Sequence, residues 1–345
     1  MIRLSNNIDL THLASFATPA KADRLIEWDS AEELANYLRG EGGNFLRNGE
    51  QWAILGEGCN TLFTKDFRGT IIRCVAKGME TIEGSDNRHT LLRVAAGEVW
   101  DNVVEECCRR GLWGAENLSA IPSSVGSSAV QNIGAYGTEA KDIIERVEYL
   151  DLEDFELKCI DCKECQFGYR DSIFKHALAG KAIITAVVYR LSSTPAPKLD
   201  YGTLRPEVEK CGAELTPMVI REAVIRIRSS KLPDHKVIGN AGSFFKNPIL
   251  PRTFVEELRK RYPAMPIYEV AGEPDKLKIA TGWMIDHLGW KGKNIGRAGV
   301  HTQQALVLVN LGGATGDEVV TLAERICREV YEVFGVEISP EVNIL

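Results

Sequence analysis

The segment Asn117–Gly137 constrains the fold of this chain most, because it can form neither an amphipathic helix nor an amphipathic strand. It is rich in Ser, Gly, Ala and Asn and carries little charge. A helix or strand that packs on a core needs one apolar face. Small, uncharged residues leave the main chain accessible instead. The segment therefore predicts irregular backbone that wraps around a ligand.

A second glycine-containing loop comes earlier in the chain. Residues Gln51–Leu55 read as a short buried strand, and Gly56-Glu57-Gly58-Cys59-Asn60 follows at once. Successive backbone N–H groups in such a turn can form an anion-binding nest, which suits a pyrophosphate. The spacing matches neither the Rossmann nor the P-loop pattern. Two charge-poor loops in one half of a chain can hold a large cofactor mainly through main-chain contacts.

The remaining patterns alternate between strands and helices and indicate an α+β fold. We expect a domain boundary near residues 229–235 and an irregular loop over Ser192–Pro206. Apolar runs rich in Ile, Leu and Val predict strands at Thr70–Val75, Leu91–Ala96, Val147–Leu152, Ala182–Leu191 and Ala305–Asn310. Helical periodicity predicts helices at Glu98–Arg110, Leu215–Ser230, Thr253–Tyr262, Lys278–Leu288 and Thr315–Phe334. In the last of these, Thr315 and Glu318 form a capping box and Gly335 ends the helix.

The run Gly239–Pro248 places one hydroxyl, Ser243, at the end of a series of small residues. Phe244 and Phe245 follow, and then Lys246 and Asn247. A hydroxyl and a cation beside an apolar wall suit an anionic substrate and a proton transfer. The alternative is a glycine-rich turn whose two Phe side chains belong to the core.

Two further residues carry chemistry that fits an anionic substrate. Arg170 lies in an aromatic and hydroxyl-rich run and can hold a carboxylate in a bidentate fork. The alternative is a structural ion pair, for example with Asp171. Glu341, near the end of the sequence, follows the stiff residue Pro340 and precedes the alternating Val342 and Ile344.

The composition excludes some functional classes. The formal net charge of −7 argues against a general nucleic-acid binder. An anionic small molecule needs a local cluster of cations, for which Arg170, Lys175, Lys231 and Lys246 are candidates. Residues Met1–Ala20 lack the apolar core of a signal peptide, and no apolar run is long enough to span a bilayer. We expect a cytoplasmic protein without membrane insertion.

Nine cysteines in a chain without export signals predict reduced thiols. Cys159, Cys162 and Cys165 have C-x2-C-x2-C spacing, which could begin an iron–sulfur site. A fourth ligand at the expected distance is missing, and no histidine groups with them. Thiols at a strand edge or turn remain the favoured reading, and we predict no metal.

Several long motifs in the same order resemble the UDP-N-acetylenolpyruvoylglucosamine reductases, flavoenzymes of peptidoglycan precursor synthesis. The resemblance covers nearly the whole chain. The motifs are Leu55–Phe63, Ile121–Gly137, Tyr169–Ser172, Gly239–Pro248 and His301–Ala305. Two positions depart from the family pattern: Ser123 stands where glycine is common, and Cys59 stands where serine is common.

The resemblance implies a fold and a division of the chain. An FAD-binding portion of the vanillyl-alcohol-oxidase type would span residues 1–228, as two subdomains with a boundary near 70–80. An α/β substrate-binding domain would span 229–335, and residues 336–345 would return to the active site.

The resemblance also implies site residues. Ser243 matches the proton donor, and Arg170 and Glu341 match residues at the carboxylate of the substrate. Tyr201 matches the loop that closes over the substrate diphosphate in one subtype. Other substrate contacts would come from Tyr169, Lys231, Lys246, Asn247 and Gln304. FAD would be held without a covalent bond by Gly56, Glu57, Gly58, Cys59, Asn60, Thr61, Ile121, Pro122, Ser123, Gly126, Ser127, Ser128, Asn132 and Gly134.

The implied reaction uses NADPH and FAD to reduce the enolpyruvyl ether of a UDP-sugar, in a monomer. Arg170 suits the negative charge that develops on the substrate, whereas Glu341 helps only if it carries a proton. Two other classes stay open. One is an oxidase with covalently tethered flavin, since Cys59 lies in a candidate loop. The other is a non-catalytic thiol or metal-binding module built on Cys159, Cys162 and Cys165.

Overall fold

Two units divide the residues that the computed structural model describes, which are 1–270 and 272–345. The first unit comprises Met1–Ile8, Ala22–Glu57 and Arg68–Ser230. The second comprises Asp9–Lys21, Gly58–Phe67 and Lys231–Leu345. The chain therefore passes from one unit to the other within the predicted Gly56–Asn60 turn.

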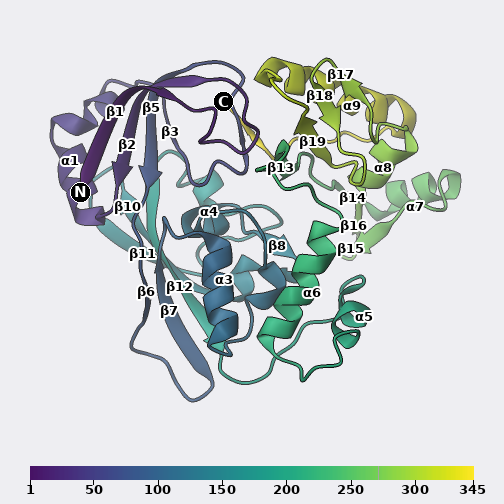
Figure 1. Cartoon of the computed structure of the whole chain (residues 1–345), viewed down its shortest axis with the longest axis horizontal. Helices are drawn as coiled ribbons and strands as arrows, with labels where there is room; N and C mark the ends of the chain where they lie inside the picture. The colour runs from purple at the N-terminus through teal and green to yellow at the C-terminus, as the bar shows by residue number, and fades with distance from the viewer. Residues whose placement is uncertain (271) are drawn as a thin grey trace. The chain divides into compact units, whose positions relative to one another are not determined.

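A five-stranded antiparallel sheet organises the first unit (Figure 1). Its central strand β12 is apolar at nearly every position and is buried along most of its length. Trp100, Val103 and Cys107 of α3 pack into the core of this sheet, as does Val125 of α4. The strand order is β11 (Leu157–Asp161), β10 (Ile144–Asp151), β12 (Ala182–Ser192), β7 (His89–Ala95) and β6 (Met79–Thr81). The helices are α3 (Trp100–Arg109) and α4 (Val125–Val130).

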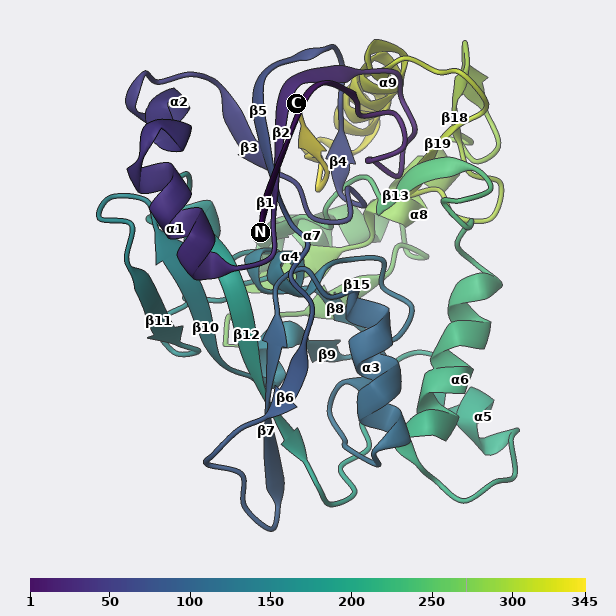
Figure 2. The same ribbon diagram turned by 60° about the vertical axis from the view of Figure 1, so that its left-hand side comes forward.

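A smaller sheet and a helix complete the N-terminal part of this unit. Leu34 and Leu38 of α1 share a core with Trp28 of the small sheet and with Leu150 and Ile183 of the large one, so α1 lies beside β10 and β11 in Figure 2. The small sheet has the order β1 (Ile2–Asp9), β2 (Lys21–Trp28), β5 (Phe67–Cys74) and β3 (Trp52–Ile54). The helices are α1 (Ala31–Arg39) and α2 (Asn44–Arg47), and a short ribbon joins β8 (Gly134–Ala135) to β9 (Thr138–Glu139).

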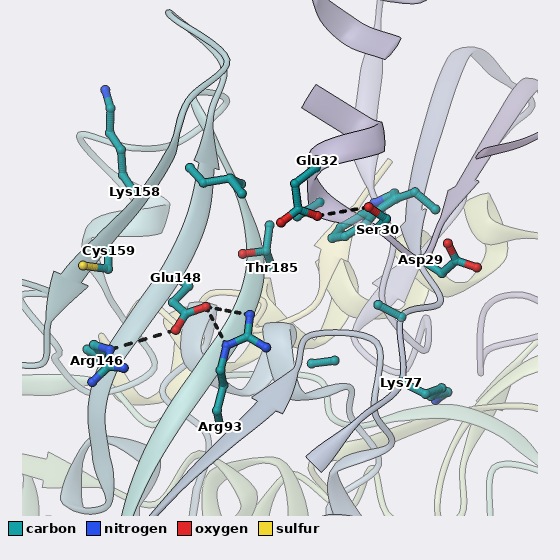
Figure 3. Close-up of a pocket in the computed structure, with 15 residues that line it drawn as sticks. Asp29, Ser30, Glu32, Lys77, Arg93, Arg146, Glu148, Lys158, Cys159 and Thr185 are labelled. Atoms are coloured by element: carbon teal, nitrogen blue, oxygen red, sulfur yellow. Dashed lines mark hydrogen bonds and ion pairs between the residues drawn. The ribbon is translucent and has the colours of Figure 1, made fainter. Parts of the chain in front are cut away.

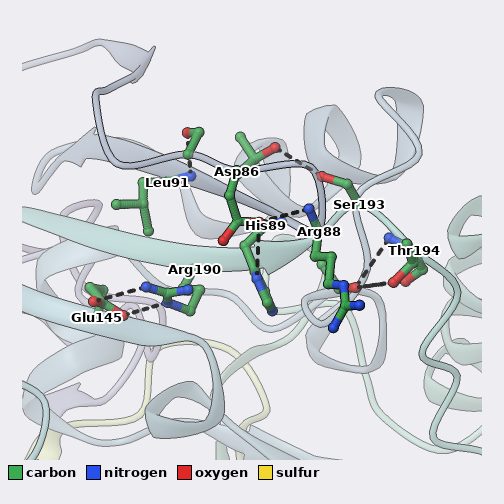
Figure 4. Close-up of polar contacts among 11 residues, drawn as sticks. Asp86, Arg88, His89, Leu91, Glu145, Arg190, Ser193 and Thr194 are labelled. Atoms are coloured by element: carbon green, nitrogen blue, oxygen red, sulfur yellow. Dashed lines mark hydrogen bonds and ion pairs between the residues drawn. The ribbon is translucent and has the colours of Figure 1, made fainter.

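Polar contacts fix the far ends of β7 and β12 (Figure 4). The Asp86 carboxylate accepts the backbone N–H groups of Arg88 and His89, each at 2.7 Å. Thr90 and Ser193 share a hydroxyl hydrogen bond of 3.2 Å across the two strands. These contacts set the register in which His89 faces Ser192.

Two helices follow the large sheet. Thr216 caps α6 (Pro217–Ser229), and Pro217 occupies its first turn, where a missing N–H costs least. Leu204 and Val208 of α5 (Leu204–Glu209) pack on Ile220 and Val224 of α6. The irregular loop predicted over Ser192–Pro206 is therefore shorter than expected, because α5 already contains Pro206.

The second unit combines two antiparallel sheets with three helices around one core. The first sheet has the order β13 (Gly239–Ser243), β19 (Val307–Asn310), β18 (Ala298–Val300) and β17 (Asn294–Ile295). The second has the order β14 (Ile249–Pro251), β16 (Lys276–Ile279) and β15 (Ile267–Glu269). The helices are α7 (Arg252–Arg261), α8 (Thr281–His287) and α9 (Gly316–Phe334), and β20 (Asn343–Ile344) runs parallel to β4 (Thr61–Leu62).

Helix α9 confirms the clearest sequence prediction. The Thr315 hydroxyl accepts the Glu318 N–H at 3.3 Å, and the Glu318 carboxylate accepts the Thr315 N–H at 2.8 Å. Gly335 ends the helix in the left-handed region with φ +67°. The apolar face of the helix ends on the buried Phe334, whereas its neighbour Val333 is 38% exposed.

Two predicted elements differ from the structure. The strand at Gln51–Leu55 was expected to be buried, but Ile54 is 47% exposed because β3 forms the edge of its sheet. The helix predicted over Lys278–Leu288 begins only at Thr281, because Lys278 and Ile279 belong to β16. None of the described helices combines the length and the apolar character that crossing a membrane requires.

Candidate active site

The two loops that the sequence singles out meet in the first unit. A side-chain carbon placed on Gly56 would lie 2.6 Å from Ser124 Oγ and would overlap Ser127 Oγ. A larger residue at this point would displace the two serine hydroxyls, because the turn after β3 lies against the start of α4. The structure thus brings together two segments separated by more than sixty residues of sequence.

The longer loop is not irregular throughout, as was predicted, because Val125–Val130 form the short helix α4 and bury Val125 and Ala129 in the core. The Ser124 hydroxyl caps the helix by accepting the Ser127 N–H at 3.3 Å. Gly126 packs against Ala96, the residue that follows β7. An added side-chain carbon would lie 3.1 Å from Ala96 Cβ, and the Gly126 N–H donates to Ala96 O at 2.9 Å. Gly126 therefore has a structural reason to be glycine.

The predicted cofactor residues of the first unit differ in exposure. Ser123, Gly126, Ser128 and Asn132 are buried, whereas the others are half-buried or exposed; these are Gly56, Glu57, Ile121, Pro122, Ser127 and Gly134. The Ser128 hydroxyl donates to Val125 O at 2.7 Å, and the Asn132 amide donates to Gly168 O at 2.7 Å. Ser128 and Asn132 support the loop in this structure, and their direct contact with a ligand stays a prediction.

Arg170 holds the end of the same loop. Its guanidinium donates to Gly134 O at 2.7 Å and to Asn132 O at 3.5 Å, and it lies 5.3 Å from the centre of the Tyr169 ring. The Asp171 carboxylate contacts His176 Nε2 at 2.7 Å, so that carboxylate is engaged elsewhere. Arg170 also has φ +55°, a conformation that costs a non-glycine residue free energy and is typical of functional positions.

Tyr201 lies at the far end of the loop. Its ring is 52% exposed and meets the Tyr136 ring edge to face, with 6.2 Å between the ring centres. A side-chain carbon on Gly137 would lie 3.5 Å from Tyr201 Cβ. The exposed ring and the predicted cofactor loop are therefore neighbours within the first unit.

Ser243 stands at an irregular point of the second unit. It ends β13 after a bulge between Asn240 and Ser243, where Gly242 has φ +68°. The Asn240 side-chain oxygen accepts the Gly242 N–H at 2.9 Å and stabilises this turn. A bulge re-aims the side chain that follows it. Ser243 is half-buried as a result.

The alternative prediction for the two Phe side chains, that they belong to the core, is confirmed. Phe244 is 0% exposed and Phe245 is 1% exposed, and both belong to the core of the second unit. They anchor the strand end on which Ser243 stands.

Glu341 lies beside this strand end. The Glu341 N–H donates to Phe244 O at 2.7 Å, and the Asn60 amide donates to Glu341 O at 3.2 Å. Pro340 pairs with Phe245, and β20 pairs with β4, which contains Thr61. The structure thus brings the backbone of Glu341 next to the residue that follows Ser243. Asn60, predicted to hold cofactor, uses its amide here to hold the C-terminal segment.

Two of the predicted substrate residues of this unit, Asn247 and Gln304, lie at the start of α8. The Asn247 side-chain oxygen accepts the Thr281 N–H at 3.0 Å. The Gln304 side-chain oxygen accepts the Leu306 N–H at 3.3 Å and would lie 3.4 Å from a side-chain carbon on Gly282. Lys246 is half-buried and Lys231 is exposed.

Gly58 shows a role that sequence reasoning missed. Its φ is +65°, and an added side-chain carbon would overlap the Leu13 carbonyl oxygen. Ser15 continues this contact, because its hydroxyl donates to Asn240 O at 2.6 Å and its N–H donates to Gly58 O at 3.1 Å. The close approach at Gly58 is thus to the segment Asp9–Lys21, which carried no sequence signal since its contacts are distant in sequence.

A cavity of about 570 Å³ lies elsewhere in the first unit, between the start of α1 and the large sheet (Figure 3). Its charges are paired: Arg93 contacts Glu148 at 2.8 Å, and Arg146 lies 4.0 Å from the same carboxylate. Of the residues singled out from sequence, Cys159 lines it. In the described part of the chain, no three His, Cys, Asp or Glu side chains are grouped so as to hold a metal ion.

Two family models match the chain. Residues 23–157 match an FAD binding domain, and residues 233–345 match the C-terminal domain of UDP-N-acetylenolpyruvoylglucosamine reductase. The loops that meet at Gly56 and α4 fit such a cofactor, because they offer small residues and main-chain atoms with little charge. The chain is an FAD-dependent oxidoreductase, and the predicted fold class is confirmed.

Close relatives identify the family. A UDP-N-acetylenolpyruvoylglucosamine reductase of Bacteroides fragilis is 46% identical over 331 residues, which are 96% of this chain and 97% of the relative. One of Flavobacterium johnsoniae is 41% identical over 346 residues and covers 100% of both chains. The crystal structure of the reductase from Thermus caldophilus has a TM-score of 0.66 at 23% identity and covers 100% of this chain and 99% of its own. The chain belongs to the UDP-N-acetylenolpyruvoylglucosamine reductase family.

Proposed function

We propose that this protein reduces UDP-N-acetylglucosamine enolpyruvate to UDP-N-acetylmuramate with NADPH as the reductant, a step of peptidoglycan precursor synthesis. The observation that carries the proposal is the pairing of Glu341 with Phe244 beside Ser243. Two residues with the chemistry of this reaction come from segments almost one hundred residues apart and meet at one strand end. The relatives that cover nearly the whole chain carry this reaction in their names.

The residues divide the chemistry as follows. Bound FAD supplies the hydride that reaches the substrate double bond. The permanent charge of Arg170 stabilises the enolate-like anion that this addition leaves on the substrate carboxylate. Glu341 contributes as a protonated hydrogen-bond donor, because a second anion would repel the intermediate. Ser243 then donates a proton to the carbanion. A serine hydroxyl is a weak acid, but the carbanion is a strong base.

The residues proposed to hold FAD are Gly56, Glu57, Gly58, Cys59, Asn60, Thr61, Ile121, Pro122, Ser123, Gly126, Ser127, Ser128, Asn132 and Gly134. Lys231, Lys246, Asn247 and Gln304 bind the UDP-sugar, together with Tyr169. Tyr201 belongs to a loop that closes over the substrate diphosphate. Its exposed ring against Tyr136 supports that role, because an exposed aromatic side chain can move without losing core contacts.

Ser243→Ala tests the proton donor. We expect the variant to bind FAD and to be reduced by NADPH at the normal rate, because the hydroxyl acts only after hydride transfer. Its reoxidation by the enolpyruvyl substrate should slow by about 10²–10⁴-fold, the usual loss for a missing general acid. Stopped-flow absorbance at the flavin band measures both half-reactions separately.

Ser339→Ala is the matched control for this experiment. Ser339 is exposed, and it contacts Lys246 N–H through its backbone oxygen, which alanine keeps. Both half-reactions of the control should remain normal. A Ser243→Ala enzyme that is reoxidised at the control's rate would remove Ser243 from the reaction.

A further inference from the structure

Charged side chains from two helices converge on Ala120, the residue just before Ile121 and Pro122 of the cofactor loop. Asp101 of α3 accepts the Ala120 N–H at 2.6 Å. Arg228 of α6 donates through Nε to the Ala120 carbonyl oxygen at 3.2 Å. Both polar groups of one loop residue are therefore held by charged side chains.

A buried ion pair holds Asp101 in place. Arg221 of α6 donates to both carboxylate oxygens of Asp101, at 2.5 and 3.0 Å, and its side chain is 7% exposed. Burial acts to raise the pKa of Asp101, but the hydrogen bonds from Arg221 and the Ala120 N–H outweigh it and lower the pKa. The carboxylate thus stays charged and remains an acceptor.

Neighbouring contacts come from the same end of α3. The Trp100 ring N–H donates to Leu118 O at 2.9 Å, and the Trp100 backbone N–H donates to Ser123 O at 2.9 Å. The first two residues of α3 therefore contact the loop on both sides of Ala120.

Ala120 needs such support, because its φ is +57°. A left-handed conformation is unfavourable for a residue with a side chain, because Cβ lies too close to the following carbonyl oxygen. Such strain persists only where the surroundings enforce it, and it is typical of functional segments. Folding stability alone gives no reason for the arrangement, since buried ion pairs are often no better than apolar packing.

The surroundings of Arg228 are unusual for a charged side chain. Burial lowers the pKa of its guanidinium, and none of the described carboxylates forms an ion pair with it. Its one hydrogen bond to a described protein atom is the bond to Ala120 O. A half-buried cation held in this way by a strained loop residue indicates that the position of the loop matters.

We propose that Asp101, Arg221 and Arg228 are positioning residues that fix the main chain at Ala120–Pro122 for FAD. The inference rests on the proposed assignment of this loop to FAD. The three side chains act through Ala120 and are not proposed to contact a reacting atom. They form a clamp, defined here as Asp101, Arg221 and Arg228 acting on Ala120.

A double variant separates positioning from stability. Asp101→Asn alone leaves the buried Arg221 with only the more distant Glu105 carboxylate, at 3.8 Å, and destabilises the protein. Asp101→Leu with Arg221→Met removes both charges and keeps apolar packing, so the melting temperature should return close to that of the wild type. The Ala120 N–H then lacks its acceptor, and we expect FAD to bind about 10- to 100-fold more weakly.

Release of FAD on dilution, followed by flavin fluorescence, measures the dissociation constant, and visible circular dichroism at saturating FAD reports its orientation. Arg226→Met is the matched control, since it breaks an ion pair of α6 with Glu207 of α5. It should leave both measurements unchanged. A double variant that binds FAD as tightly as the wild type, with the same visible spectrum, overturns the proposal.

Ser127→Leu separates the clamp from the assignment of this loop to FAD. Ser127 is a half-buried residue of the loop and lies against Gly56. Weak FAD binding in Ser127→Leu with normal binding in the double variant rejects the clamp alone. Normal binding in both rejects the assignment of the loop to FAD as well. Weak FAD binding in Ser127→Leu and in the double variant supports both the clamp and the assignment of the loop to FAD.

Discussion

At the scale of single residues, glycine positions carry much of the information about this site. Gly56 and Gly58 are two residues apart and are required for different reasons. Gly56 leaves room for the hydroxyls of Ser124 and Ser127, whereas Gly58 combines a left-handed φ with a close approach to Leu13 O. Sequence reasoning found both and assigned both to a ligand. The structure gives each of them a protein neighbour as well.

Gly58→Ala should destabilise the second unit strongly. Alanine pays the left-handed backbone penalty of about 1–2 kcal/mol and also meets the Leu13 carbonyl oxygen. Gly335→Ala is the matched control in the same unit, because Gly335 has φ +67° and no atom within 4 Å of the added carbon. We expect Gly58→Ala to cost about 1–3 kcal/mol more than the control, as overpacking does. Urea unfolding curves of both variants measure the difference, and equal midpoints would contradict it.

Glu341 offers a second test at this scale. If it acts as a protonated donor, Glu341→Gln keeps an N–H donor and most of the activity, whereas Glu341→Ala loses about 10²–10³-fold in the second half-reaction. Stopped-flow reoxidation by the enolpyruvyl substrate compares the two. If Glu341→Gln and Glu341→Ala lose the same factor in the rate of reoxidation, the carboxyl group acts through its proton or its charge and not merely as a hydrogen-bond donor.

At the scale of elements, prediction succeeded where local signals decide the structure. Helix α9 carries its own cap, stripe and terminator, so Thr315, Glu318 and Gly335 were identified from sequence alone. It failed where tertiary pairing decides. Lys278 and Ile279 fit a helical pattern, yet they pair with β14 and β15. Neither β1, whose residues are mostly polar, nor the contacts of Asp9–Lys21 had a local pattern to read.

The capping box of α9 makes part of the free energy of unfolding depend on pH. Hydrogen bonds from the Thr315 backbone and from Arg297 lower the pKa of Glu318 from 4.5 to about 2. A carboxyl group whose pKa is lower in the folded state stabilises it above the unfolded value and loses that effect as the pH falls through the folded value. This contribution is therefore fully present above about pH 4.5 and is lost towards pH 2.

Glu318→Gln should remove that portion of the pH dependence, because the amide does not titrate. Glu324→Gln is the control, since Glu324 is an exposed residue of the same helix and forms no ion pair with a described residue. Urea unfolding at pH 6 and at pH 3 compares the three proteins. The prediction is wrong if Glu318→Gln and the wild type lose the same stability between these two conditions.

At the scale of the whole molecule, the sequence motifs predicted the fold class and the cofactor, because long ordered motifs survive where single positions vary. The assignment of site residues was less complete. Ser243 and Glu341 were found as separate candidates, and their contact through Phe244 came only from the structure. Asp101, Arg221 and Arg228 had no signal at all, because a charged residue on a helix usually lies on a solvated face.

The purified protein should be yellow and should release its FAD on acid precipitation. In the proposed site the flavin is held by main-chain and polar contacts without a covalent bond, so unfolding should free it into the supernatant. Absorbance of pellet and supernatant near the flavin maximum makes the measurement. Cys59→Ser serves as the control for a thioether to the flavin and should behave identically. Colour retained in the wild-type pellet but not in that of Cys59→Ser would establish a covalent bond and favour the oxidase alternative.

The pairing of β20 with β4 gives the outermost residues of the sequence an unexpected importance. Leu345 O accepts both the N–H and the hydroxyl of Thr64, at 2.8 and 2.9 Å, and Asn343 N–H donates to Asn60 O. Substitutions that break the pairing of β20 with β4 would therefore loosen the neighbouring Glu341. The placement of a proposed catalytic carboxyl group thus depends on a two-residue strand that contains no proposed catalytic residue.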